Sequence, residues 1–177
     1  LAGCGTQTAG LGFGGYAPGS GNQNLTEEYN GTAWTGGGNL GTARRVLAGA
    51  GTQTAGLGFG GFSTVVTGIT EEYNGTAWTA GGTMNTARDQ LGGAGTQTAG
   101  LAFGGYDPGG FLKNATELYD GSSWTNSTNM ITARYRLAGA GTQPAGLAFG
   151  GEVGPAGQSA TEEFVSGVSP YAAWSTG

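Results

Sequence analysis

Adjacent glutamates are the first residues of this chain that could do chemistry. They occur as Glu27-Glu28, Glu71-Glu72 and Glu162-Glu163. Two carboxyl groups that flank one bond can hydrolyse a glycosidic linkage. Neighbouring residues of a strand point to opposite faces, however, so an adjacent pair on a strand cannot flank one bond. The pairs also recur along the chain, which favours a scaffold over a single active site.

The sequence contains no histidine. Ser-His-Asp and Cys-His catalysis are therefore excluded, and the commonest transition-metal ligand is missing. The Gly-rich string GTQTAGL at 5–11 lacks the lysine of a P-loop and is expected to join two strands, so we interpret it as a turn. We therefore expect a protein that is not an enzyme, with no catalytic residues, no metal site and no cofactor.

Arginines recur in register with the glutamates. Each of three arginines lies ten residues after a tryptophan, in a chain of which only 10% is charged. They are Arg44, Arg88 and Arg134, and the glutamates that recur beside them are Glu27, Glu71, Glu117 and Glu162. Because the planar fork of arginine matches a carboxylate, we predict a partly buried Arg–Glu contact within or between the repeated units.

A repeat in the sequence predicts the structural elements that position these glutamates and arginines. GTQTAGL begins at Gly5, Gly51 and Gly95 and returns as GTQPAGL at Gly141, in steps of 46, 44 and 46 residues. A period of this length indicates a multistranded unit. We expect one array over 1–177 with units at about 1–40, 41–85, 86–131 and 132–177. The Arg-to-Leu spacing places an arginine before Leu1, and the spacing from each tryptophan to its arginine places another beyond the last residue, so we expect both ends to cut a connector.

The composition limits the partners. With 41 glycines the chain could be disordered, but large apolar residues recur in register, which argues for a fold. A net charge of −5 without clustered Lys or Arg argues against binding to nucleic acid. No apolar run approaches the roughly 20 residues that cross a bilayer, so we expect no membrane insertion.

The single cysteine, Cys4, aligns with alanines, which predicts a small buried side chain and leaves the redox compartment open.

Each unit is predicted to contain two β-hairpins. The segments VLAGA at 46–50 and LGFGG at 57–61 read as strands joined by GTQTAG. TEEY at 70–73 and TAWT at 76–79 flank Asn74-Gly75, which we place at the centre of a two-residue turn, as with Asn30-Gly31 and Asp120-Gly121. Four short strands per unit, without a helical period, predict an all-β fold and one blade of a β-propeller.

The landmarks of each unit resemble those of the kelch repeat. A double glycine follows a hydrophobic strand, a tyrosine has a glutamate two places before it, and a tryptophan, a methionine and an arginine follow. In the second unit these are Gly60-Gly61, Glu71, Tyr73, Trp78, Met84 and Arg88. In the last unit Phe164 replaces the tyrosine and Trp174 follows ten residues later, which requires a longer hairpin.

The resemblance implies a kelch-like β-propeller of four visible four-stranded antiparallel blades. We expect these to be part of a larger propeller or array, with a closed four-bladed ring as the second alternative. It also implies structural roles, including buried rings, for Trp34, Trp78, Trp124, Trp174, Tyr29, Tyr73 and Tyr119. Kelch-like copper oxidases that resemble galactose oxidase need histidines, which this chain lacks.

The segments between the hairpins differ from unit to unit, whereas the turns within hairpins hardly change. They are YAPGSGNQNL at 16–25, FSTVVTGI at 62–69, YDPGGFLKNA at 106–115 and EVGPAGQSA at 152–160. In a propeller the two kinds of connection emerge at opposite faces, and variable loops on a rigid scaffold are common binding sites. The candidate ligand-binding residues are Tyr16, Phe62, Tyr106, Asp107, Phe111 and Lys113, which would suit a glycan or a protein partner.

Three functions compete. The Gly- and Thr-rich repeats are similar to those of phage tail or fibre proteins and bacterial surface proteins, which implies a non-enzymatic structural or binding module at an extracellular or virion surface. An intracellular kelch adaptor for a protein partner is the first alternative. A structural element that assembles with copies of itself is the second, so a homo-oligomer or larger assembly stays open.

Overall fold

The computed structural model describes residues 1–166 and 172–177 and confirms the all-β prediction, with no helix in those ranges. Sixteen strands form four antiparallel sheets of four strands each, in the orders β1-β2-β5-β6, β10-β9-β8-β7, β11-β12-β13-β14 and β15-β16-β19-β20. We call these sheets blades 1 to 4 in chain order.

Each blade corresponds to one sequence repeat. Blade 1 contains β1 (Ala2–Thr6), β2 (Ala9–Phe13), β5 (Thr26–Tyr29) and β6 (Trp34–Gly36). Blade 2 contains β7 (Ala48–Thr52), β8 (Ala55–Phe59), β9 (Thr70–Tyr73) and β10 (Trp78–Ala80). Blade 3 contains β11 (Gly92–Thr96), β12 (Ala99–Phe103), β13 (Thr116–Tyr119) and β14 (Trp124–Ser127). Blade 4 contains β15 (Ala138–Thr142), β16 (Ala145–Phe149), β19 (Thr161–Val165) and β20 (Ala173–Thr176).

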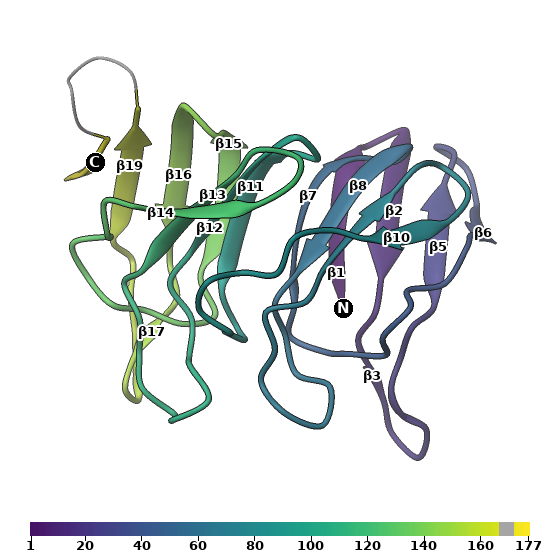
Figure 1. Ribbon diagram of the computed structural model, residues 1–177, viewed down its shortest axis with the longest axis horizontal. Helices are drawn as coiled ribbons and strands as arrows, with labels where there is room; N and C mark the ends of the chain where they lie inside the picture. Colours follow the sequence, from purple (N-terminus) through teal and green to yellow (C-terminus); the bar gives the residue numbers. More distant parts are fainter. Residues whose placement is uncertain (167–171) are drawn as a thin grey trace.

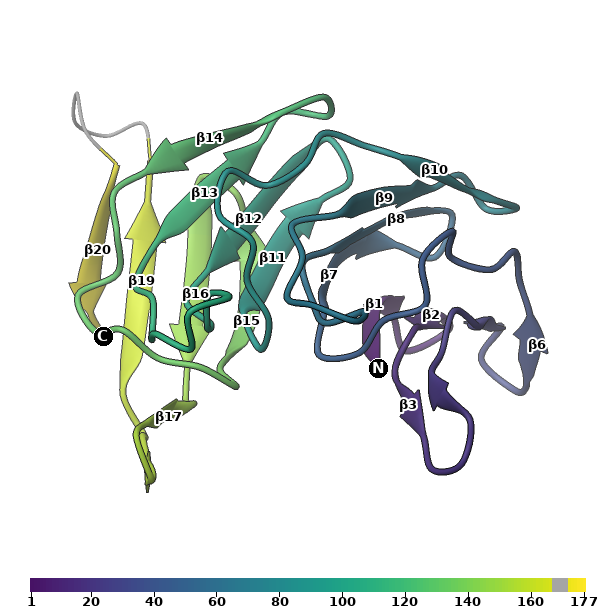
Figure 2. The ribbon, with the colours of Figure 1, turned by 60° about the horizontal axis from the view of Figure 1, so that its bottom comes forward.

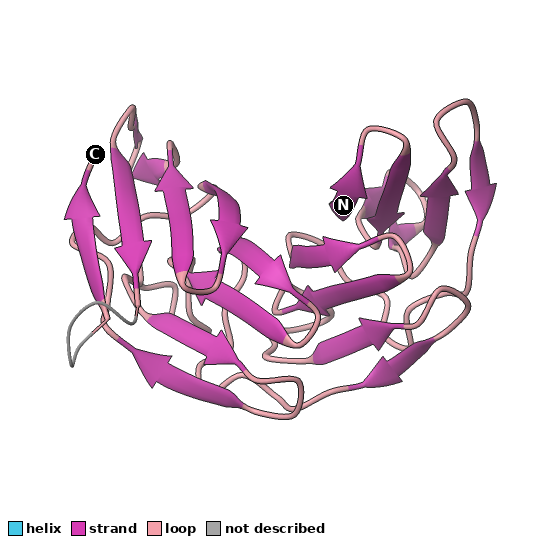
Figure 3. Ribbon diagram, turned by 90° about the horizontal axis from the view of Figure 1, so that it is seen from above, coloured by secondary structure: helices cyan, strands magenta, loops and turns pink. Residues whose placement is uncertain are grey.

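The four blades are arranged as a β-propeller. The first strands of successive blades, β1, β7, β11 and β15, pack side by side in chain order. Figure 3 shows these strands on the concave side of an arc, with β6, β10, β14 and β20 on its outer rim. Among the described residues, the strands of blades 1 and 4 do not pack on each other as neighbouring blades do. The two blades therefore stand at separate ends of the arc.

The first hairpin of each blade turns within the GTQTAG string. Thr52 pairs with Ala55, so Gln53 and Thr54 are the turn residues and both strands extend further into the string than predicted. Gly51 has a φ of 99°, and a Cβ added to it would lie 2.2 Å from the carbonyl oxygen of Ala55. Glycine is therefore required there, which explains why this glycine recurs in every blade, as Gly5, Gly51, Gly95 and Gly141.

The second hairpin corrects one prediction. Tyr73 pairs with Trp78, and the Asn74 N–H donates to the Ala77 carbonyl at 3.2 Å, so Gly75 and Thr76 are central and not Asn74 and Gly75. Gly75 has positive φ, whereas Asn74 does not. The Asn74 side chain accepts from the N–H groups of Thr76 and Ala77, at 3.0 and 2.9 Å. An asparagine that caps the turn in this way belongs at its first corner.

The last blade keeps the register expected from the sequence. Phe164 pairs with Trp174, as Tyr73 pairs with Trp78 in blade 2. The connection from β19 to β20 is longer, and residues 167–171 of the segment VSGVSPYAA lie outside the described residues.

Tryptophans join one blade to the preceding blade. Trp124 of blade 3 packs at a tilt against Phe59 of blade 2, with 5.0 Å between ring centroids, and its indole N–H donates to the Thr70 hydroxyl at 2.9 Å. Trp78 and Trp174 make the equivalent contacts. Large apolar rings between glycine-rich sheets therefore provide the packing at each blade interface.

The predicted Arg–Glu contact is present three times and is fully buried. Arg44 lies 3.0 Å from Glu71, and the Arg88–Glu117 and Arg134–Glu162 pairs are each 2.9 Å apart. Each arginine comes from the connector that precedes the blade of its glutamate. In the second interface Arg88 also donates to the carbonyls of Gly104 and Ala115, at 2.8 and 2.6 Å. The ion pair and these hydrogen bonds thus hold the connector against the following blade, at the start of its variable loop.

Blade 1 departs from the predictions. Trp34 is 53% exposed, Tyr29 is only half-buried, and Glu27 is exposed with no arginine against it in the described part of the chain. The tryptophan interface explains the difference, because the preceding blade buries Trp124 and Trp174 and half-buries Trp78, whereas in the described part of the chain no blade packs on that side of blade 1. Cys4, predicted to be buried, is half-buried beside the core of blades 1 and 2, and burial raises the pKa of its thiol to about 11.

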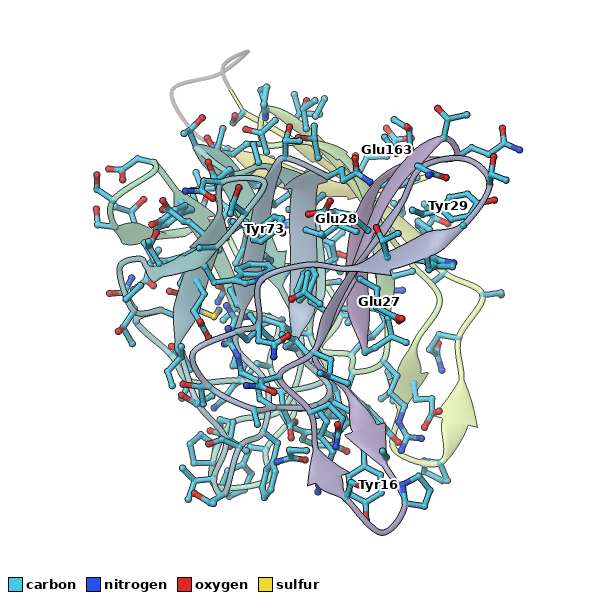
Figure 4. The ribbon with its side chains drawn as sticks, turned by 90° about the vertical axis from the view of Figure 1, so that its right-hand side faces the viewer. Tyr16, Glu27, Glu28, Tyr29, Tyr73 and Glu163 are labelled. Atoms are coloured by element: carbon cyan, nitrogen blue, oxygen red, sulfur yellow. The ribbon has the colours of Figure 1, made fainter. Side chains whose placement is uncertain are left out.

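The second glutamate of the first two pairs also has a structural partner. The Tyr73 hydroxyl donates to Glu28, and the Tyr119 hydroxyl donates to Glu72, both at 2.5 Å. Figure 4 shows Tyr73 pointing toward Glu28 of the preceding blade. The two glutamates of a pair therefore serve opposite faces of their strand, as the strand alternation predicts.

Alkaline pH should weaken the blade 2–3 interface. Burial and the Glu72 carboxylate raise the pKa of Tyr119 from its ordinary value of 10.0 to about 12. Because the folded protein holds this proton more tightly, the contribution is complete below about pH 10 and is lost as the pH rises toward about 12. Urea titrations across this range should show a fall in the free energy of unfolding that is shallower in Tyr119→Phe. A fall that is as steep in the variant would contradict the assignment.

Candidate binding face

All four segments between hairpins lie at one end of the molecule. Figures 1 and 2 show the loop that carries β3 (Tyr16–Ala17), the loops of the two middle blades and the loop that carries β17 (Glu152–Val153) at the same end, opposite the hairpin turns. The prediction of one uniform and one variable face is therefore confirmed. We call the variable end the loop face.

The loops have more internal structure than their sequences predict. β3 pairs with β4 (Gly21–Asn22), and β17 pairs with β18 (Ala156–Gly157). In the middle blades single bridges join Phe62 to Val66 and Tyr106 to Leu112. Each loop is thus a small hairpin or bridged turn that stands on its blade.

The connectors between blades contribute residues that the sequence reasoning missed. The residue after each buried arginine bridges to the residue after the double glycine, in the pairs Arg45–Phe62, Asp89–Tyr106 and Tyr135–Glu152. In the sequence these residues lie in the tripeptides RRV, RDQ and RYR. In each tripeptide two variable residues follow the recurring arginine. These connector residues vary from unit to unit, as the loops do, and that variation was the reason for selecting the loops as candidate sites.

The next connector residue has a strained backbone. Val46, Gln90 and Arg136 have φ values of 49°, 52° and 54°, a region that residues other than glycine rarely adopt. The Gln90 N–H donates to the Val46 carbonyl and the Arg136 N–H donates to the Gln90 carbonyl, both at 2.8 Å. The left-handed conformation therefore allows hydrogen bonds from connector to connector, across three consecutive blades.

A cation lies between two aromatic rings at the loops of blades 1 and 2. The Arg45 guanidinium lies 4.5 Å from the Phe62 ring centroid and 5.2 Å from that of Tyr16. Its Nη1 donates to the Asn22 side chain at 3.0 Å. Tyr16 is 58% exposed, and Figure 4 shows it near the tip of its loop. Two predicted residues, Tyr16 and Phe62, are therefore brought together by an arginine that was not predicted.

A second cluster lies at the loops of blades 3 and 4. The Tyr106 and Tyr135 rings are 4.5 Å apart, and the Tyr135 hydroxyl donates to Glu152. Arg136 lies 3.3 Å from Glu152 and donates to Gln90 at 2.8 Å. The hydrogen bond from Tyr135 lowers the pKa of Glu152, so this carboxylate remains charged at neutral pH.

The other predicted residues form a pair within one loop. Asp107 lies 2.7 Å from Lys113 and accepts from the N–H groups of Gly109 and Phe111, at 3.0 and 2.9 Å. These bonds lower the pKa of Asp107, the lysine contact most strongly. The Phe111 ring is 67% exposed, with Lys113 at 5.9 Å. The loop thus exposes the apolar ring of Phe111 beside the Asp107–Lys113 ion pair.

A hollow separates the loops of blades 2 and 3. It measures about 330 Å³ and is lined by residues of both loops and of their connector. These are Phe62, Val66, Asp89, Gln90, Tyr106 and Asp107, with Pro108 and Gly110 at its edge. Asp89 is buried, and burial raises the pKa of its carboxyl. Three of the six predicted ligand-binding residues, Phe62, Tyr106 and Asp107, line this hollow.

Within the described ranges no cluster of metal-ligating side chains is present, and no helix is long and apolar enough to cross a membrane. No protein-family model matches the sequence, and no curated protein is significantly similar to it. The class is therefore defined by the fold and its loop face: the protein is a four-bladed all-β propeller that presents variable, structured loops at one end and uniform turns at the other.

Proposed function

We propose that the protein is a non-enzymatic binding module that recognises carbohydrate at the loop face. The observation that carries this proposal is the hollow between the loops of blades 2 and 3, where rings of Phe62 and Tyr106 lie beside hydrogen-bonding groups of Asp89, Gln90 and Asp107. A sugar ring has an apolar face and an equatorial belt of hydroxyls, and a pocket that combines aromatic rings with a few convergent polar groups is suited to it.

The exposed aromatics around the hollow extend the same chemistry. Tyr16 and Phe111 each present a ring next to a charged side chain, Arg45 and Lys113 respectively. A row of such positions along the arc suits an oligosaccharide better than a single sugar. The loops are hairpins held by the blades, so little conformational entropy is lost when a ligand binds.

The glutamate pairs support a role without catalysis. Glu71 is bonded to Arg44 and Glu72 accepts from Tyr119, on opposite faces of one strand. Each carboxylate of this pair is therefore occupied by a contact that holds blades and connectors together, and the two do not face a common substrate.

The resemblance to kelch repeats of phage tail or fibre proteins and bacterial surface proteins supports placing this module at a virion or cell surface. A protein partner is the alternative occupant of the loop face, in the manner of a kelch adaptor. The exposure of Val65 and Phe111, at 63% and 67%, favours that alternative, since apolar side chains on adjacent loops can form the centre of a protein interface.

A glycan array followed by titration of the best ligand tests the proposal. Replacing 106–113 with the corresponding loop of blade 2 should weaken binding by roughly tenfold or more, because it removes Tyr106, Asp107 and Phe111 together. The matched control is Thr98→Ala, an exposed turn residue at the opposite end. Unchanged binding after the loop replacement would exclude this face as the site, and binding to no glycan would favour the protein partner.

A further inference from the structure

Asp89 is a buried carboxylate without a counter-charge. It is 8% exposed, and the ion pairs among the described residues do not include it. In the same ranges its carboxylate has one side-chain hydrogen bond, a long one from Gln90 at 3.4 Å. The other buried charged side chains of the described ranges are all paired, as Arg44–Glu71, Arg88–Glu117 and Arg134–Glu162. An unpaired buried carboxylate is costly, and burial raises the pKa of this carboxyl.

The fold does not require a carboxylate at this position. Asp89 follows a buried arginine, and the same position holds Arg45 in the preceding connector and Tyr135 in the next. In all three connectors this residue makes the same backbone bridge to the following loop. The Asp89 N–H donates to the Tyr106 carbonyl and its carbonyl accepts in return, both at 3.0 Å; Arg45 and Phe62 make the same two bonds, at 3.0 and 2.8 Å. The bridge therefore explains the position but not the aspartate.

Asp89 lines the hollow between the loops of blades 2 and 3. Two aromatic rings, Phe62 and Tyr106, and a second carboxylate, Asp107, line it as well. Asp107 is already paired with Lys113, at 2.7 Å. No arginine or lysine of the described chain lines the hollow.

Arg45 is a cation near the hollow. It lies over the Phe62 ring, and it lowers the pKa of Asp89 less than burial raises it. The negative charge of Asp89 is thus only partly compensated by the groups around it.

An ammonium group complements this hollow better than a hydroxyl group does. An ammonium supplies a counter-charge to the buried carboxylate, whereas a hydroxyl supplies only a hydrogen bond. Aromatic faces also attract a cation, and the two carboxylates disfavour an acidic sugar. The hollow measures about 330 Å³. That volume is near the lower limit of small-molecule sites, about 300 Å³, and therefore suits one sugar ring better than several.

We propose that this hollow selects a sugar residue with a free amino group, and that the Asp89 carboxylate binds its ammonium. The Phe62 and Tyr106 rings would pack against the apolar face of the sugar. Gln90 positions the carboxylate, because its amide donates to Asp89 while it accepts from Arg136 at 2.8 Å. The inference rests on the proposed carbohydrate binding and adds the chemical class of the sugar.

Titration with two disaccharides tests this class. One is the disaccharide of glucosamine, with free amines, and the other is its fully N-acetylated form, which is neutral. We expect the amine form to bind at least roughly tenfold more tightly at about 0.15 M salt, which screens the net negative charge of the protein. Equal affinities, or tighter binding of the acetylated form, would overturn the inference and leave the carbohydrate function standing. Binding to no glycan at all would remove both.

A lysine derivative separates a sugar from a protein partner. Nα-acetyl-lysine amide carries a primary ammonium but no sugar ring, so we expect it to bind at least roughly tenfold more weakly than the amine disaccharide. Equal affinity would assign the hollow to a lysine side chain of a protein and overturn the amino-sugar inference.

Asp89→Asn removes the charge and keeps the shape of the side chain. The preference for the amine form over the acetylated form should fall by roughly thirtyfold or more, as for the loss of one partner of a buried charge pair. The matched control is Asp120→Asn, which removes the same charge from a turn at the opposite end, where other blades have Asn30 and Asn74. This control should keep the full preference. Equal losses in the two variants would show a general effect of net charge and would overturn the inference.

Urea denaturation of Asp89→Asn separates a binding role from a structural one. Burial raises the pKa of Asp89 in the folded protein, so its charged form lowers stability at neutral pH. The neutral asparagine should therefore unfold at the same urea concentration as the wild type or at a higher one. An earlier transition in the variant would show that the carboxylate holds the fold together, and its assignment to ligand binding would be wrong.

Discussion

Replacing Trp124 with alanine is expected to lower the free energy of unfolding by about 3 to 5 kcal/mol. The indole is 4% exposed, packs at a tilt against Phe59 of the preceding blade and Tyr119 of its own, and donates to the Thr70 hydroxyl. Its removal leaves a cavity between two blades whose other residues are largely small, so neighbouring side chains cannot fill the space. Urea denaturation followed by circular dichroism measures the loss.

The matched control for this prediction is Trp34→Ala. Trp34 occupies the same position in the repeat but is 53% exposed, so its replacement should cost less than about 1 kcal/mol. Equal losses at the two positions would show that burial by the preceding blade is not the source of the tryptophan contribution.

Replacing Glu117 with glutamine is expected to cost about 3 to 5 kcal/mol, because it leaves the buried Arg88 guanidinium without a counter-charge. The two side chains are 2.9 Å apart, and both have no exposed surface. Glu117 also accepts from the N–H groups of Asn85 and Thr86, at 2.7 and 3.2 Å. Burial lowers the pKa of Arg88, because the protein interior disfavours the charged guanidinium.

Glu27→Gln is the matched control, because Glu27 holds the same position in blade 1, is exposed, and has no arginine against it in the part of the chain that the structure describes. We expect a change within about 0.5 kcal/mol. A loss for Glu117→Gln as small as that would show that the hydrogen bonds of the glutamine replace the ion pair, and that the charge itself contributes little.

The repeat unit could be predicted in detail because its determinants are local. The first turn at Gly51, the second turn near Asn74 and the alternation of Leu57 with Gly58 depend on neighbours a few residues away. The Arg–Glu contact was also predictable, since two residue types that recur at one spacing occupy one environment. The central residues of the second turn were misplaced because Asn-Gly fits two positions of a turn, and only the strand register distinguishes them.

The loop face was only half predictable. Loop variation identified Tyr16, Phe62 and Tyr106, but their arginine and tyrosine partners, Arg45 and Tyr135, come from connectors that are distant in sequence. The contacts depend on how one blade is placed on the next, which no local pattern encodes.

The sequence by itself determined the blade: four strands, two hairpins, and the residues that recur at its interfaces, because these follow from periodicity and turn chemistry within some forty-five residues. Tertiary structure alone decided which copies of those residues are buried. Trp34 and Trp124 occupy the same position in their repeats, yet one is exposed and the other is in the interior. The physical reason is that a tryptophan is buried by the blade before it, so its environment depends on the packing of a neighbouring sheet and not on its own repeat.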